Sequence, residues 1–166
     1  MTVVSDSTPL IHLSSVGDLG LLRDLFGRIK ISQAVFHEVV TYGRGRPGAE
    51  EVAKASGTWI DVAERAPTAF TLQIMDEQKL QLGEMQTIEL ATELTAEIVL
   101  IDERRAVQFA RESGLTVLRT GTIYAASKRS GLISSVRERL IALRASGFWL
   151  TDRDYLSILA ACGEQP

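Results

Sequence analysis

Four acidic residues stand where their carboxylates could act together: Asp6, Glu38, Glu84 and Asp102. Asp6 and Asp102 each follow a short apolar run directly, and a charge in that place must emerge at the end of a buried strand. Glu84 opens an amphipathic segment, and Glu38 lies at the margin of the apolar stripe of a helical segment. This pattern predicts acids at the carboxyl ends of parallel strands, where open α/β sheets bind ligands.

Carboxylates that lie close together repel one another unless cations neutralise them. Mg²⁺ and Mn²⁺ are hard ions that favour oxygen ligands, so they suit such a group. Two ions about 4 Å apart could activate a water and stabilise the leaving oxygen of a phosphodiester. The four acids therefore predict a metal-dependent nuclease.

Each acid also has an ordinary structural explanation. Asp6 could cap the first helix together with Ser7, and Glu84 could favour the positive N-terminus of its helix. Asp102 could begin the next helix, and Glu38 could lie on a solvated helix face. Taken singly, these roles are the commoner ones, so the metal site depends on the co-occurrence of all four acids.

The elements that must position the acids alternate between apolar strands and amphipathic helices. Strands are predicted over 2–6, 29–31, 59–62, 98–101 and 115–118. Helices are predicted from Thr8 and over 19–26, 32–41, 49–56, 68–79, 84–94, 103–113, 122–130, 134–146 and 151–162. The alternation indicates a mostly parallel sheet covered by helices on both faces, a three-layer α/β/α sandwich.

Composition narrows the class of protein. With 166 residues, 45% of them hydrophobic, the sequence predicts one globular domain over 1–166 with a full core. It has no apolar run of about 18 residues and no signal peptide, so we expect a cytoplasmic protein without a membrane segment. A single cysteine, Cys162, excludes an internal disulfide. The net charge of −3 excludes a domain that coats nucleic acid through a wide basic face.

Motifs along most of the chain resemble those of PIN-domain proteins. They are Val3–Leu10 (VVSDSTPL), Phe36–Val39 (FHEV), Gly83–Ala91 and Leu100–Ala106, followed by Gly121-Thr122, Lys128–Ile133 and Gly147–Leu150 (GFWL). As a set they are similar to a prokaryotic PIN-like branch whose members often sit beside small antitoxin-like genes. The resemblance is weakest between about 43 and 80.

The resemblance implies a Rossmann-like sandwich and Mg²⁺- or Mn²⁺-dependent cleavage of RNA. Asp6, Glu38, Glu84 and Asp102 take the family's acidic places, as catalytic and metal-binding residues. Glu84 is a glutamate where many PIN domains carry aspartate. The sequence is thus interpreted as an endoribonuclease, the toxin of a type II toxin–antitoxin pair. The alternative is a catalytically weak or inactive PIN-like binding module.

Basic and hydroxyl residues near the acids are candidate substrate contacts. Several basic residues follow the carboxyl ends of the fourth and fifth strands, where they could contact phosphates. Ser7 resembles the hydroxyl residue that often follows the first acid. The predicted substrate-binding residues are Ser7, Arg104, Arg105, Thr120, Thr122 and Lys128, with Arg119 and Arg129 as further phosphate contacts.

Other residues receive weaker assignments. Arg44 and Arg46, in a glycine-rich loop, could clamp an RNA backbone or a partner. His12 and His37 have no role in a metal-dependent reaction and are expected at the surface or its boundary. A phosphotransfer domain of similar topology is disfavoured, because the stretch after Asp6 lacks a second aspartate two residues on.

The two helices predicted over about 134–162 hold more apolar residues than one edge helix needs. These could form a homodimer face or receive an antitoxin helix. They could equally belong to the core. They are Leu140, Ile141, Leu143, Phe148, Trp149, Leu156, Ile158 and Leu159.

Overall fold

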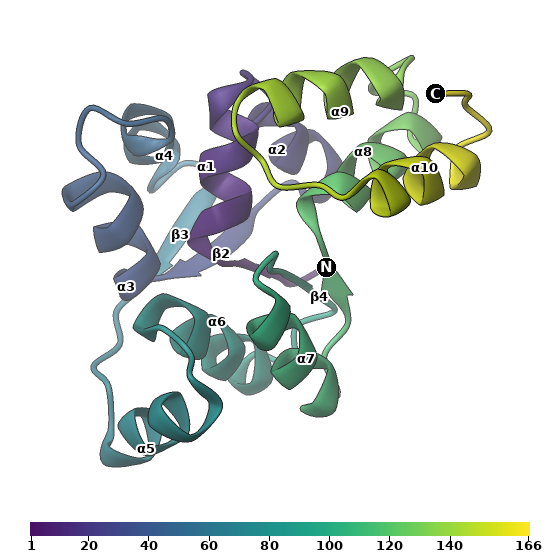
Figure 1. Ribbon diagram of the computed structural model, residues 1–166. Helices are drawn as coiled ribbons and strands as arrows, with labels where there is room; N and C mark the ends of the chain where they lie inside the picture. The colour runs from purple at the N-terminus through teal and green to yellow at the C-terminus, as the bar shows by residue number, and fades with distance from the viewer.

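A five-stranded sheet lies at the centre of the computed structural model, which describes residues 1–166 (Figure 1). Neighbouring strands are all parallel, in the order β3-β2-β1-β4-β5. The strands are β1 (Val3–Ser5), β2 (Ile29–Ser32), β3 (Ile60–Ala63), β4 (Ile98–Leu100) and β5 (Val117–Leu118). The α/β/α sandwich predicted from the sequence is therefore confirmed.

Helices connect the strands and cover both faces of the sheet. They are α1 (Ser7–Ser15), α2 (Gly20–Phe26), α3 (Gln33–Phe36), η1 (His37–Thr41), α4 (Ala49–Ala55), α5 (Ala69–Gln78), α6 (Leu82–Glu93), α7 (Arg104–Glu112), α8 (Thr120–Arg129), α9 (Val136–Ala145) and α10 (Asp152–Ala161). None of these helices combines the length and the apolar character needed to cross a bilayer.

The chain order changes direction between β1 and β4. From β1 the chain builds β2 and β3 on one side, then returns to place β4 and β5 on the other. β1 and β4 pair in register, with Val4 opposite Val99 and Ser5 opposite Leu100. The backbone N–H of Asp6 donates to the carbonyl of Leu100 at 2.9 Å. The carboxyl ends of these two strands therefore lie side by side, at the place where such sheets bind ligands.

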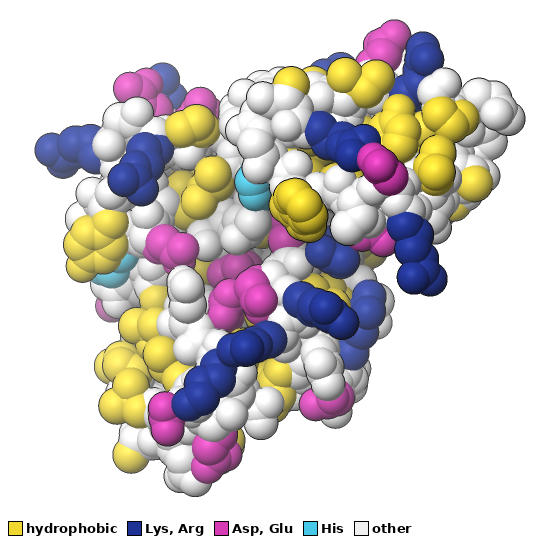
Figure 2. All heavy atoms as spheres, viewed as in Figure 1, with side chains coloured by type: hydrophobic (Ala, Val, Ile, Leu, Met, Phe, Trp, Pro, Cys, Tyr) yellow, Lys and Arg dark blue, Asp and Glu magenta, His cyan; other side chains and the backbone are white.

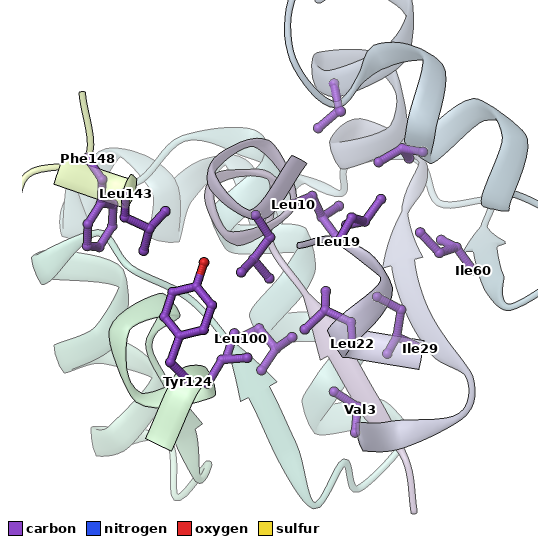
Figure 3. Packing of buried hydrophobic residues seen from close by; sticks show 14 of the residues in the cluster. Val3, Leu10, Leu19, Leu22, Ile29, Ile60, Leu100, Tyr124, Leu143 and Phe148 are labelled. Carbon is purple, nitrogen blue, oxygen red and sulfur yellow. The ribbon is translucent and has the colours of Figure 1, made fainter. Parts of the chain in front are cut away.

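Two hydrophobic cores sandwich the sheet because successive strand residues point to opposite faces. On one face, Val3 and Leu100 pack with residues of α1, α2, α8 and α9, including the buried Tyr124 (Figure 3). On the other face, Val4 and Val99 pack with residues of α6 and α7. Figure 1 shows α1, α8, α9 and α10 on one side of the sheet, with α5, α6 and α7 on the other. Asp6 and Asp102 lie at the carboxyl ends of β1 and β4, between these layers.

The structure refines three boundaries. The helix predicted over 32–41 consists of α3 and a wider π-helical turn, η1, in which the N–H of Tyr42 bonds to the carbonyl of His37 at 2.8 Å. The strand predicted over 115–118 pairs only at Val117 and Leu118. The segment before Glu84 begins its helix earlier, at Leu82, because Gln81 is the capping residue.

Most apolar residues of α9 and α10 belong to the core. Leu140, Leu143 and Leu159 are buried, and so is Phe148 in the connecting loop. Ile141, Leu156 and Trp149 remain exposed. The core explanation therefore accounts for the larger part of this apolar content, and the exposed side chains alone are available to a partner.

Candidate active site

Asp6 lies at the end of β1 and is 2% exposed. It occupies the capping position of α1, yet its side chain makes no capping hydrogen bond, and its Oδ1 atom has no hydrogen-bond partner. Burial raises the pKa of the Asp6 carboxyl to about 8. The backbone N–H of Ser7 has the opposite effect and lowers this pKa. The charges of Glu38, Glu84 and Asp102 raise this pKa further, so all three carboxylates lie near enough to Asp6 to repel its negative charge. The Asp6 side chain therefore does not cap α1.

Glu38 reaches the same point from the π-helical turn η1. Such wide turns are frequent at functional sites, because they re-aim the side chains that they carry. Gly83 shows how close the two acids approach. A Cβ atom on Gly83 would lie 2.8 Å from Oε2 of Glu38 and 3.5 Å from Oδ1 of Asp6. A side chain at Gly83 would therefore touch both carboxylates, and the exposed Glu38 would have to shift to make room for it.

Glu84 stands in the first turn of α6. Its Oε2 atom accepts a hydrogen bond from the N–H of Gln81 at 2.8 Å, which closes a capping box. Burial raises the pKa of the Glu84 carboxyl, and the charges of Glu103 and Glu38 add to this effect, while the Gln81 N–H opposes it. Glu84 thus serves its helix terminus and also faces the other acids.

Asp102 is buried at the end of β4 and is held by Thr120. The Thr120 N–H donates to Oδ1 at 2.7 Å and the Thr120 hydroxyl donates to Oδ2. Burial raises the pKa of Asp102, although these hydrogen bonds and the charges of His12 and Arg119 act in the opposite direction. The helix that follows is capped by Glu103, whose carboxylate accepts from the N–H of Arg105 and of Ala106. Asp102 is therefore not needed as a helix cap.

Figure 2 shows acidic side chains gathered in the middle of one face, with basic side chains beside them. We call Asp6, Glu38, Glu84 and Asp102 together the acidic surface. Their donor set suits a divalent cation, because the unpartnered, buried Oδ1 of Asp6 lies beside the Glu38 carboxylate. As they stand, no three Asp, Glu, His or Cys side chains converge closely enough to hold one ion. Both carboxylate oxygens of Asp102 already accept hydrogen bonds from Thr120. The best-prepared ligands are therefore Asp6 and Glu38.

The predicted substrate contacts fall into two groups. Arg104 is exposed and lines the cleft next to Asp102, and Arg105 is exposed on the same helix turn. Arg119 also lines this cleft, and its guanidinium donates to the backbone carbonyl of Asp102 at 3.1 Å. Ser7 is buried in the first turn of α1. Arg104 and Arg119 thus line the cleft beside Asp102, and the role of these residues in substrate binding stays a prediction.

The other group lies elsewhere or is already engaged. Thr120 is fully buried against Asp102, so it positions the acid instead of facing a substrate. The Thr122 hydroxyl caps α8 by bonding to the backbone of Arg119. Lys128, near the far end of α8, pairs with Glu164 at 2.6 Å. Lys128 does not line the cleft, because it lies near the C-terminal end of α8, whereas the cleft lies at the N-terminal end of that helix.

The two histidines and the glycine-rich loop differ in how close they lie to the acids. His12 is half-buried, packs edge-on against Phe148 with ring centroids 4.7 Å apart, and lines the cleft. Burial lowers the pKa of His12, and the charge of Asp102 opposes this shift. His37 bonds to Thr41 within η1. Arg44 and Arg46 are exposed.

Sequence reasoning missed two residues beside the acidic surface. Glu103 directly follows Asp102, and its position before an amphipathic helix was the available signal for its capping role. Gly83 lies against the carboxylates of Glu38 and Asp6. The sequence offers little indication of this role, because a glycine in the first turn of a helix usually has no functional meaning.

Comparison with known proteins identifies the family of the chain. A search of curated proteins finds no match. A family model described as a PIN domain matches residues 2–164, nearly the whole chain. The chain therefore belongs to the PIN-domain family, whose members generally act as nucleases.

Proposed function

We propose that this protein is a metal-dependent endoribonuclease that hydrolyses RNA phosphodiesters with Mg²⁺ or Mn²⁺. The observation that carries the proposal is the Asp6 carboxyl, which is buried, lacks a hydrogen-bond donor at Oδ1 and is surrounded by three further acids. An uncompensated buried charge is costly, and a bound cation would remove that cost. Membership of a nuclease family supports the same conclusion.

Asp6 and Glu38 would hold the ion, with Glu84 and Asp102 beside them. Bound Mg²⁺ or Mn²⁺ supplies an activated water and neutralises charge on the phosphate. Around it, the chain keeps the carboxylates in place: Thr120 fixes Asp102, and the backbone of Gln81 fixes Glu84. Because these hydrogen bonds exist before a substrate binds, they reduce the reorganisation that the reaction needs.

The test is cleavage of RNA by the purified protein. We expect cleavage with Mn²⁺ or Mg²⁺ and none in EDTA. Asp6→Ala or Asp102→Ala should abolish it. Lys54→Ala is a suitable control, because Lys54 is exposed on α4 and pairs only with Glu50. Activity that survives both aspartate changes, or that EDTA leaves intact, contradicts the proposal.

A second candidate is an inactive PIN-like binding module. Two observations favour it: Glu84 and Asp102 already accept hydrogen bonds, and no three acids converge on one point. Calorimetric titration with Mn²⁺ separates the candidates, because an ion that binds the folded state must stabilise it. Heat of binding with a rise in melting temperature supports the enzyme. Their absence supports the inert module.

The toxin role rests on the resemblance to antitoxin-linked PIN proteins. We propose that the protein acts in the cytoplasm and is neutralised by a small antitoxin, with the exposed Ile141 and Leu156 available to a partner or a second copy. Growth arrest on induction, relieved by co-expression of a short adjacent gene, is the expected result. Light scattering tests for a homodimer. A protein that remains monomeric at high concentration would contradict the dimer proposal.

A further inference from the structure

A small cavity of about 180 Å³ lies between the first turn of α8 and α10. It adjoins the cleft of about 980 Å³ beside Asp102, and the side chains of Arg119, Phe148 and Asp154 line both. Pockets for drug-sized ligands usually measure about 300 to 1,000 Å³. The small cavity therefore suits a compact planar group, held close to the acidic surface.

One part of the cavity is apolar and well packed. Phe148, Leu150 and Ile158 line it, the first of them buried and the other two half-buried. Gly121 at the start of α8 lets two of these side chains come close to the helix. A Cβ atom on Gly121 would lie 2.8 Å from Cδ1 of Ile158 and 4.0 Å from Cδ1 of Leu150. These side chains can pack against the flat face of a ring.

Opposite charges face the cavity from two different elements. Arg119 directly precedes α8, and its guanidinium donates to the backbone carbonyl of Asp102 at 3.1 Å. Asp154 lies in the first turn of α10, three residues before Ser157, so both side chains project from the same helix face. Neither Arg119 nor Asp154 takes part in an ion pair. A ligand in the cavity can therefore meet hydrogen-bond donors on one wall and acceptors on the other.

Among the four bases of RNA, guanine matches this arrangement best. It carries two acceptors, O6 and N7, on one edge, which an arginine can contact with two hydrogen bonds. On the adjacent Watson–Crick edge it carries two donors, N1–H and N2–H, which suit the acceptor-only oxygens of a carboxylate. Adenine has no pair of acceptors along that edge, and each pyrimidine has only one nitrogen that can donate. Guanine alone satisfies both walls.

We propose that this cavity binds a guanine base of the RNA substrate, with Arg119 on O6 and N7 and the Asp154 carboxylate on the N1–H and N2–H groups. This inference rests on the proposed ribonuclease function and names the base at which the enzyme cuts. Because Arg119 also contacts the backbone of Asp102, a base held in the cavity brings its neighbouring phosphodiester beside the acidic surface. Cleavage then occurs next to guanosine.

Nucleoside monophosphates test the cavity without any cleavage. The protein is titrated in EDTA with guanosine, inosine or adenosine monophosphate and followed by amide NMR, which measures weak binding and locates it. The three ligands carry the same phosphate, so differences in affinity come from the base. We expect guanosine monophosphate to bind about tenfold more tightly than inosine monophosphate, which lacks the N2 amine. The amide signals of Gly121 and Ser157 should shift.

Variants of the two walls test the assigned contacts. Asp154→Asn should remove most of the preference for guanosine over inosine monophosphate, because an amide replaces one acceptor oxygen with a donor. Arg119→Lys should weaken guanosine monophosphate binding about tenfold, since an ammonium group cannot make the two-bond contact. Asp152→Asn is the matched control, because Asp152 lies in the same helix turn and pairs with Arg144 but lines neither cavity nor cleft. The same spectra establish that each variant is folded.

Sequencing of product ends tests the link to cleavage. A pool of random-sequence RNA is digested with Mn²⁺, and the nucleotides on both sides of each cut are counted. We expect guanosine to be enriched at one position next to the cut bond. Asp154→Asn should abolish this enrichment, and Asp152→Asn should keep it.

Equal affinities for the three monophosphates overturn the inference, and so does a guanine preference that Asp154→Asn retains. If guanosine monophosphate binds as expected but the cut sites show no enrichment of guanosine, the cavity takes a free nucleotide and its role in substrate selection is contradicted. Failure of the proposed function gives a different result. In that case no Mn²⁺-dependent cleavage occurs, while binding follows the expected pattern, so the guanine site stands and the enzymatic role falls.

Discussion

Asp6 carries a conflict between burial and charge that a cation can resolve. Its pKa of about 8 means that much of the metal-free protein holds a proton there near neutral pH. A bound divalent ion competes with that proton for the same oxygen atoms. Metal binding should therefore release protons, and its affinity should rise with pH through this range.

Asp6→Asn should remove the conflict without changing the shape of the side chain. We expect the metal-free variant to melt roughly 5 °C higher than the wild type at pH 8, because no charge is buried. Mn²⁺ should no longer raise its melting temperature. The measurement is differential scanning fluorimetry with and without Mn²⁺. A variant that still responds to Mn²⁺ would place the ion elsewhere.

Gly83→Ala should damage the site through a single methyl group. The added Cβ would lie 2.8 Å from Oε2 of Glu38, so this carboxylate must move away from Asp6. We expect cleavage to fall by about tenfold to a hundredfold, because small displacements of reacting groups have effects of that size. Gly20→Ala is the control, since Gly20 also begins a helix and its Cβ would meet nothing closer than 3.9 Å. Equal activities of the two variants would contradict this geometry.

At the scale of elements, the start of α8 positions Asp102. The helix begins at Thr120, whose N–H and hydroxyl both bond to the carboxylate. A helix N-terminus favours negative charge, so the helix and the acid stabilise each other. The acid of one element is thus oriented by the first turn of another, seventeen to eighteen residues later in the chain.

Thr120→Val should test this positioning role. It removes the hydroxyl donor but keeps the backbone N–H and the volume of the side chain. We expect cleavage to fall about tenfold, in line with the loss of a hydrogen bond to a charged group. Thr120→Ser should restore most of the activity, and the pH profile of Thr120→Val should shift towards higher pH as the Asp102 carboxyl loses a donor. No shift in the profile would indicate a purely structural role.

A second polar contact of α8 joins it to other helices on the same face of the sheet. The buried Tyr124 hydroxyl of α8 donates to Asp18 at 2.9 Å, and Arg139 of α9 donates to the same carboxylate at 2.8 Å. Burial and the Asp18 charge raise the pKa of the Tyr124 hydroxyl, which keeps it protonated as a donor. This contact fixes the loop between α1 and α2 against α8 and α9.

Tyr124→Phe should lower the free energy of unfolding by about 1–2 kcal/mol, because it leaves a buried acceptor with one donor fewer. Urea denaturation measures this change. Cleavage per folded molecule should stay near the wild-type value at low temperature, since Tyr124 does not face the acids. A large loss of activity without a loss of stability would contradict a structural role.

At the scale of the whole molecule, the acidic surface makes stability depend on pH. The Asp6 pKa is about 8 in the folded protein and near the ordinary 3.8 in the unfolded chain. Between these values the folded protein binds more protons, so the free energy of unfolding of the metal-free protein should fall as pH rises from about 4 to 8. The raised pKa values of Glu84 and Asp102 act in the same direction.

Melting temperatures in EDTA between pH 5 and 8.5 should show this decline, and saturating Mn²⁺ should reduce it. Asp6→Asn should flatten the profile. Glu164 behaves oppositely, since burial is outweighed by Lys128 and the backbone N–H groups of Val136 and Arg137, which hold its pKa near 2. Its contribution is lost only as pH falls from about 4.5 towards 2. A metal-free protein that becomes more stable from pH 5 to 8 would rule out a buried Asp6.

The periodic parts of the fold were predictable from sequence. Strands ending at Asp6 and Asp102, and the helices between them, followed from apolar runs and breaker residues. The adjacency of β1 and β4 was a condition of the metal-site hypothesis, and the pairing of these two strands in the structure meets it. The features that were predictable depend on local chemistry.

Details that depend on side-chain direction were not predictable. Nothing in the sequence shows that Thr120 turns towards Asp102, that Gly83 separates two acids, or that α8 carries Lys128 to Glu164. Trp149 read as one of several apolar residues near the C-terminal helices, because periodicity cannot distinguish an exposed indole from a core one. Such facts arise from packing between elements that are distant in sequence.

The acidic surface draws on β1, η1, α6 and β4, and it is completed by the first residue of α8. No shorter stretch contains the set. A ribosome must therefore finish at least the first 120 residues before the proposed chemistry can begin, and a protease that cuts within that span dismantles it. A chain that stops before Thr120 therefore lacks the residue that orients Asp102.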